Sequence, residues 1–306
     1  MLDQDTFLTT LYVIIDDFCR QKRPTEPIQT GPIPILNRSE VICLALFGQW
    51  ARFRSERDFW RFATTKLTHL FLKLPNLSQF NRAQRLHQED IVAFSHYLVE
   101  LMQAKNCPFE VIDRCGVSTR WCSRRGVGWL PEFTDKGLCS RLGFFEGVHL
   151  LTCVNPEGVI TGFAVGPASA KDQPLAEALF AARHHPIAGT CFVGSACRSG
   201  DYVTDVGFNG KARHQHWLAA FGVRVIHSGK GYTRLWRRWL AGLRQIIETV
   251  HNCLVNTFRL EEERPHELRG FFARLSAKVA LHNFCIWLNR SLGRPSLQFA
   301  DLLGWD

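Results

Sequence analysis

Apolar residues recur at helical spacing through the first third of the chain, which predicts a helical N-terminal region. The first run is carried by Phe7, Leu8, Leu11, Tyr12, Ile14, Ile15 and Phe18. A proline-rich connector follows at 24–34 and interrupts the helical pattern. Asn37 and Glu40, three residues apart, predict a capping box that begins a second helix, and Ser55 opens another amphipathic run.

The pattern changes to short β-rich runs after Pro108. Residues 109–113 predict a strand that ends in an acid, Asp113. The runs 148–154 and 159–165 lie on either side of a turn segment and predict a β-hairpin. A mixed sheet is therefore expected to begin in the middle of the chain.

Strands and helices alternate in the last half of the sequence. Residues 114–141 read as irregular, and 172–184 predicts a helix. Short buried strands are expected at 190–193 and 223–226, and 234–290 reads as two long helices. This order predicts an α/β fold in which helices cover the faces of a mixed sheet.

Three regions follow from these patterns. Residues 1–105 form a helical N-terminal region, 106–295 form the domain with the sheet, and 296–306 form a C-terminal tail.

The composition is that of a basic globular protein. The 306 residues include 37 Lys and Arg against 28 Asp and Glu, which leaves a net charge of +9. Hydrophobic residues make up 46%, so the composition argues against a disordered chain. The excess of positive charge predicts an acidic partner such as nucleic acid.

The location predicted from the sequence is the cytoplasm, in association with the nucleoid and without a membrane partner. No apolar run reaches the roughly 18 residues of a membrane span, and the N-terminus lacks the basic region of a signal peptide. The eleven cysteines include no Cys-x-x-Cys pair, which is typical of reduced thiols. Cys115, Cys122 and His149 do not have the spacing of a known zinc ribbon.

Two acids occupy positions where packing gives them no role. Asp113 ends an apolar strand, and Glu248 lies in the apolar and basic segment 244–249. Between them, the segment 194–200 follows the predicted strand 190–193.

Several segments, in the same order, resemble the bacterial insertion-sequence transposases of the DDE type. They are Ser39-Glu40-Val41, Phe80-Asn81-Arg82, Val111-Ile112-Asp113, Gly147-Val148-His149-Leu150-Leu151, Pro167-Ala168-Ser169-Ala170-Lys171-Asp172 and Arg244-x-x-x-Glu248-Thr249. The resemblance implies a ribonuclease-H-like catalytic domain that cleaves and joins DNA strands. It also implies an N-terminal region that binds the terminal inverted repeats or mediates dimerisation, and a homo-oligomer when two ends are brought together.

In such a site, two Mg²⁺ or Mn²⁺ ions are held by two Asp and one Glu. Asp113 and Glu248 match the first and third acids. The second acid is usually followed by Ser-Ala-Tyr or Lys-Gly-Tyr, and the most natural alignment places Gly194 there, or Ser195 after a shift of one residue. A replacement acid would have to come from Asp201 or Asp205, both beyond the predicted strand.

The missing acid leaves three functions open. The chain is an active transposase, a catalytically dead or domesticated DNA-binding protein derived from one, or a structure-selective nuclease with a ribonuclease-H-like fold. Inverted repeats around the gene would separate the nuclease from the mobile element.

A basic segment at 198–244 contains nine Lys and Arg against two Asp, interleaved with His, Tyr and Trp. Bases and aromatic rings together suit phosphate contact and base stacking, although a solvated face over core tryptophans would give the same pattern. A second basic segment lies at 114–141. The residues expected to contact double-stranded DNA are Arg124, Arg125, Lys230, Arg234, Arg237, Arg238 and Arg244. Arg244 is also expected to orient Glu248 or hold a phosphate.

For two further residues the sequence favours a structural role over a functional one. His149 is expected to pack within its strand or to contact DNA, and Asp172 to cap the helix that follows it.

Overall fold

A computed structural model describes residues 1–23, 34–120, 129–184, 199–227, 231–262, 264 and 266–305. The chain divides into two compact units, which are described separately. Unit 1 comprises Met1–Leu98, Asn256–Leu260 and Glu267–Asp306, and unit 2 comprises Val99–Val255 and Glu261–His266.

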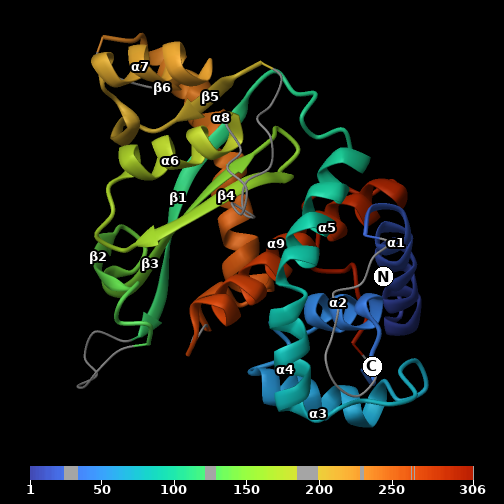
Figure 1. Ribbon diagram of the computed structural model, residues 1–306. Coiled ribbons are helices and arrows are strands. Elements are labelled where there is room, and N and C mark those ends of the chain that lie inside the picture. Colours follow the sequence, from blue (N-terminus) through green and yellow to red (C-terminus); the bar gives the residue numbers. More distant parts are fainter. Residues whose placement is uncertain are drawn as a thin grey trace. The chain divides into compact units, whose positions relative to one another are not determined.

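Unit 1 is built from helices, as its sequence predicts. The capping box at the start of the second helix is present, since the Asn37 side chain accepts from the Glu40 N–H and the Glu40 side chain accepts in return. The Ser55 side chain caps the third helix by accepting from the backbone N–H of Asp58. The helices are α1 (Gln4–Lys22), α2 (Arg38–Phe47), α3 (Glu56–Lys66), α4 (Leu77–Leu86), most of α5 (Gln88–Leu101), and α9 (Leu268–Ser291) (Figure 1).

Helix α9 belongs to unit 1, which differs from the predicted division at residues 105 and 295. Its side chains are buried around the whole circumference between Ala277 and Ile286, so it needs partners on all sides. Phe284 of α9 packs edge-on against Phe7 of α1, with ring centroids 5.4 Å apart. The C-terminal helix therefore completes the core that the N-terminal helices begin.

Unit 2 contains a mixed sheet. β3 pairs antiparallel with β1 along one of its edges. Along its other edge, β3 pairs antiparallel first with β2, through residues 143–147, and then with β4, through residues 148–154. β5 pairs parallel with β1, and β6 pairs parallel with β5. The strands are β1 (Glu110–Arg120), β2 (Asp135–Cys139), β3 (Gly143–Val154), β4 (Ile160–Pro167), β5 (Asp201–Thr204) and β6 (Arg224–His227).

The α/β class predicted from the sequence is confirmed, and so is the hairpin, which is β3–β4. The expectation that Asp113 ends its strand is wrong. β1 continues to Arg120 because β3 pairs with it along its length, so Asp113 lies inside the sheet. The strand predicted at 190–193 lies outside the described residues.

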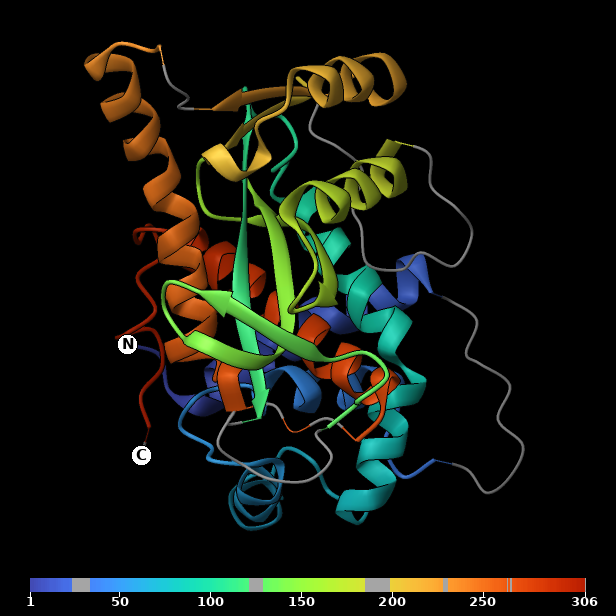
Figure 2. The same cartoon turned by 90° about the vertical axis from the view of Figure 1, so that its left-hand side faces the viewer.

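Helices cover both faces of this sheet (Figure 2). α6 (Asp172–His184) and α7 (Lys211–Phe221) pack on one face, where Ile112, Leu151 and Trp217 belong to the same buried core. α8 (Arg234–Asn252) lies on the opposite face and contacts β1, β3 and β5. Since side chains alternate along a strand, Asp113 faces α8 while its neighbours Ile112 and Arg114 face α6.

No helix in the described ranges combines the length and apolarity that crossing a membrane requires.

Candidate functional site

Asp113 lies on the face of the sheet that α8 covers. Its Oδ2 atom accepts a hydrogen bond from Nη2 of Arg244 at 2.8 Å, and its Oδ1 atom accepts from the backbone N–H of Arg114 at 2.8 Å. Glu248 follows Arg244 by one helical turn and is exposed. The structure thus brings Arg244 onto Asp113 and places Glu248 on the same side of α8.

A second carboxylate lies on the neighbouring strand. The parallel pairing of β1 with β5 joins Glu110 to Tyr202 and Val111 to Val203. Extended two residues beyond its last pair, this register aligns Asp113 with Asp205, which directly follows the last residue of β5. The Asp205 Oδ1 atom accepts from the N–H of Gly207 at 2.6 Å, which fixes the carboxylate in a turn.

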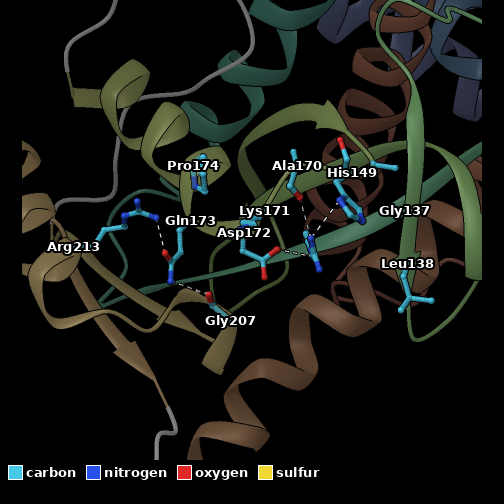
Figure 3. A pocket seen from close by; sticks show the side chains of 13 residues that line it. Gly137, Leu138, His149, Ala170, Lys171, Asp172, Gln173, Pro174, Gly207 and Arg213 are labelled. Atoms are coloured by element: carbon cyan, nitrogen blue, oxygen red, sulfur yellow. Dashed lines mark hydrogen bonds and ion pairs between the residues drawn. The ribbon is translucent and has the colours of Figure 1, made fainter.

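A third carboxylate, Asp172, pairs with Arg114 at the start of α6 (Figure 3). The Nε atom of Arg114 lies 2.6 Å from Oδ1 of Asp172, and its Nη1 atom donates to the Ala170 carbonyl at 3.2 Å. Burial raises the pKa of the Asp172 carboxyl; the charge of Arg114 opposes this rise, while Asp205 and Asp113 add to it. The charge of Asp172 is therefore coupled to those of Asp205 and Asp113.

An open pocket of about 740 Å³ lies beside this group, between the start of α6 and the sheet (Figure 3). Arg114, Lys171 and Arg213 contribute positive charge to its wall, and Asp172 contributes the negative charge. His149 also lines the pocket, with Nδ1 at 3.4 Å from Nη1 of Arg114. The predicted helix cap Asp172 is thus the partner of Arg114, and the strand residue His149 is buried.

The described acids are suitable ligands for a hard cation, but they are not assembled around one point. Asp113, Asp205 and Glu248 offer the carboxylate oxygens that Mg²⁺ prefers. Within the described ranges, however, no three His, Cys, Asp or Glu side chains are arranged to hold a single ion. Both oxygens of Asp113 already accept hydrogen bonds from protein groups.

Asp205 is a second candidate for the missing acid beside Gly194. The sequence predicts Asp201 and Asp205 beyond the strand at 190–193, which lies outside the described residues; in the structure, Asp201 begins the separate strand β5 and Asp205 immediately follows it. The signal was present in Asp205-Val206-Gly207-Phe208, since glycine and an aromatic ring follow the acid at the second and third places, as in Asp-Lys-Gly-Tyr. Gly194 lies outside the described residues.

The first half of α8 presents the basic surface that the sequence predicts. Arg234, Arg237 and Arg238 are exposed there. Lys230, Arg124 and Arg125 lie outside the described residues.

Aromatic rings form a continuous series beside these arginines. Ring centroids lie 5.4 Å apart for His214 and His227, 6.0 Å for His227 and Tyr232, and 6.2 Å for Tyr232 and Trp236. The series ends at Trp239, 4.9 Å from Trp236 and 51% exposed. The rings near α8 are therefore accessible, unlike Trp217 of α7, which is a core residue.

Two buried imidazoles predict that the protein loses stability in mild acid. Burial lowers the pKa of both His149 and His251 from 6.5 to about 4, with help from Arg114 and Arg141 respectively. The folded protein keeps both rings neutral, while the unfolded chain protonates them below pH 6.5. Stability is therefore complete above pH 6.5 and falls toward pH 4, by roughly 2 kcal/mol per imidazole at pH 5.

Urea unfolding at pH 7.5 and pH 5 measures this loss. His251→Gln preserves a hydrogen-bonding group for the Thr152 hydroxyl, which lies 2.8 Å from Nε2 of His251, and should reduce the difference between the two pH values. His216→Gln, at an exposed position of α7, should leave it unchanged. An unaltered difference in His251→Gln would contradict the assignment.

The chain matches no protein-family model, no curated protein and no solved structure at a significant level.

Proposed function

We propose that this protein is a DNA transposase of the DDE type, which binds the ends of its element and cleaves and joins DNA strands. The observation that carries the proposal is the parallel register of β1 and β5, whose extension by two residues aligns Asp205 with Asp113. Helix α8 adds Arg244, which binds Asp113, and Glu248 one turn further on. The chain thus supplies an aspartate on β1, an aspartate directly after the adjacent strand β5, and a glutamate on a later helix.

The order of the strands supports a ribonuclease-H-like fold for unit 2. β1, β3 and β4 form an antiparallel series, and β5 and β6 add parallel to the other edge of β1. In this arrangement Asp113 belongs to β1 and Asp205 directly follows β5, the strand paired with β1, although the two residues are far apart in the sequence. Helices on both faces of the sheet fit the same architecture.

The protein groups at the site have separable roles in this proposal. Asp113, Asp205 and Glu248 would hold Mg²⁺ or Mn²⁺. When bound, the metal activates a water or a 3′-hydroxyl and stabilises the leaving oxygen. Arg244, which neutralises Asp113 in the structure, is placed to exchange this carboxylate for a phosphate of the DNA.

The exposed half of α8 is the proposed DNA-contacting surface. Guanidinium groups at Arg234, Arg237 and Arg238 suit backbone phosphates, and the accessible ring of Trp239 suits stacking on a base. Arg244 and Glu248 lie further along the same helix. DNA bound to the first half of α8 would therefore lie close to Arg244 and its partner Asp113.

One observation favours a second candidate, a DNA-binding protein without catalytic activity. Asp113 is fully occupied by Arg244 and the Arg114 N–H, and no three metal-ligating side chains converge in the described residues. In that case the basic face of α8 would bind DNA, and the acidic residues would have no catalytic role.

Cleavage of DNA that carries both flanks of the gene tests the proposal. The protein is expected to nick this DNA in the presence of Mg²⁺ or Mn²⁺ and to lose the activity on chelation. Asp113→Asn should reduce the rate about 100-fold or more, since it removes a charged ligand and keeps the shape of the side chain. DNA binding without any cleavage, at all metal concentrations, would favour the second candidate.

A further inference from the structure

A second pocket, of about 630 Å³, lies in unit 1 and is lined by residues of α3 and of the start of α4. Its wall contains three arginines and no acidic residue. The lining residues are Arg57, Trp60, Arg61, Thr64, Asn76, Leu77, Ser78 and Arg82.

The positive charge of this pocket is not compensated by neighbouring acids. Glu56 on α3 is directed to Asn81 and Arg274, at 3.3 and 3.2 Å. Asp58 accepts from the backbone N–H of Arg54 at 2.9 Å. Within the described part of the chain, none of the three pocket arginines forms an ion pair.

The arginines come from two helices and converge on one space. Arg57 and Arg61 lie one turn apart on α3, and Arg82 comes from α4. The Trp60 ring, which lines the pocket, is stacked on Phe80 with centroids 4.5 Å apart, so one wall is held rigid. A guanidinium fork matches the oxygens of a phosphate, and three forks at separate positions match several phosphates better than one.

The start of α4 adds to the attraction for anions. The capping box of Asn76 and Gln79 uses the N–H groups of these two residues. Leu77 and Ser78, in the first turn of α4, line the pocket, so the positive end of this helix dipole lies near it and favours a phosphate.

We propose that this α3–α4 pocket binds consecutive backbone phosphates of DNA, separately from the basic face of α8. The proposal rests on the proposed function for the identity of the partner as DNA. The structural evidence for the proposal is the group of three arginines in the pocket wall that form no ion pair among the described residues. Arg57 and Arg61 are separated by a helical turn of about 5.4 Å, of the same order as the spacing of phosphates along a strand.

Fluorescence anisotropy with a labelled duplex, at several salt concentrations between 50 and 300 mM, tests this contact. The variant Arg57→Gln/Arg61→Gln/Arg82→Gln should bind at least about 10-fold more weakly at the lowest salt concentration. The slope of log affinity against log salt should fall by about 2 to 3, since each lost phosphate contact reduces it by roughly 0.9. The substitutions are at a pocket wall, and circular dichroism checks that the helices remain.

The matched control removes the same charge from other exposed positions of unit 1. Lys22→Gln/Lys73→Gln/Arg269→Gln should retain the slope of the unaltered protein. A pocket variant with the slope of this control would overturn the proposal while leaving DNA binding by α8 intact.

Two further outcomes separate the sources of failure. If the unaltered protein binds no duplex, the proposed function fails together with the pocket. If inorganic phosphate binds the unaltered protein but not the pocket variant, and the duplex slope is equal for both, the pocket is a small-anion site and the proposal for DNA is wrong.

Discussion

Asp205→Asn is expected to reduce metal-dependent DNA cleavage about 100-fold or more, to the level of Asp113→Asn. The register of β1 and β5, extended by two residues, aligns these two aspartates, and in the proposed site each supplies a charge that the other cannot replace. Asparagine keeps the volume of the side chain and an oxygen that can accept from the Gly207 N–H. A fall in activity would therefore report the lost charge rather than a disrupted turn.

Asp201→Asn is the matched control, because Asp201 lies on the same strand. Its carboxylate binds the exposed Arg224, at 2.5 and 2.7 Å, and not the neighbourhood of Asp113. This variant should cleave DNA at nearly the unaltered rate. If Asp205→Asn remained active while Gly194→Asp increased activity, the second acid would belong at Gly194 and the assignment of Asp205 would be wrong.

Arg183→Met is expected to lower the free energy of unfolding by about 3–5 kcal/mol. Arg183 of α6 and Glu110 of β1 form a two-pronged ion pair, at 2.7 and 3.0 Å, and both side chains are completely buried. The hydroxyl of Thr161 also donates to Glu110. Removing the guanidinium leaves a carboxylate in the interior without its counter-charge, which is far more costly than losing an exposed pair.

Urea unfolding at pH 7.5 measures this effect. The double variant Glu110→Gln/Arg183→Met leaves no isolated charge and should recover at least half of the loss. Arg224→Gln, which breaks the exposed pair with Asp201, should cost less than about 1 kcal/mol. Equal losses for Arg183→Met and Arg224→Gln would show that the buried pair contributes no more than the surface pair.

Local sequence patterns predicted most helices of unit 1 and the β3–β4 hairpin of unit 2. Side chains that act within one turn are visible in the sequence, as with the Asn37–Glu40 box. The β3–β4 hairpin was equally predictable, since its strands flank a short turn and pair with each other. Helix α7 (Lys211–Phe221) was not predicted, because Trp217 is its one buried residue and its neighbour Leu218 is exposed, so no apolar stripe marks the helix.

The candidate site was predictable in part. Asp113, Arg244 and Glu248 were identified from their sequence surroundings, and the structure joins the first two directly. The strand that precedes Asp205 was not predicted, because β5 has only four residues, too few for a clear alternating pattern. The untested identity of the second acid is what Asp205→Asn and Gly194→Asp would decide.

Local features of this protein can be inferred from its amino-acid order: helices with their caps, the hairpin, the basic composition and the acids at Asp113 and Glu248. The contacts between distant groups are visible only in the folded chain. The parallel pairing of β1 with β5 spans about ninety residues and, when extended by two residues, aligns Asp205 with Asp113, and α8 adds Arg244 from still further along the chain. The spacing of hydrophobic residues indicates which face of a helix or strand is buried. It does not specify the register between two strands, because backbone hydrogen bonds and packing in the shared core establish that register.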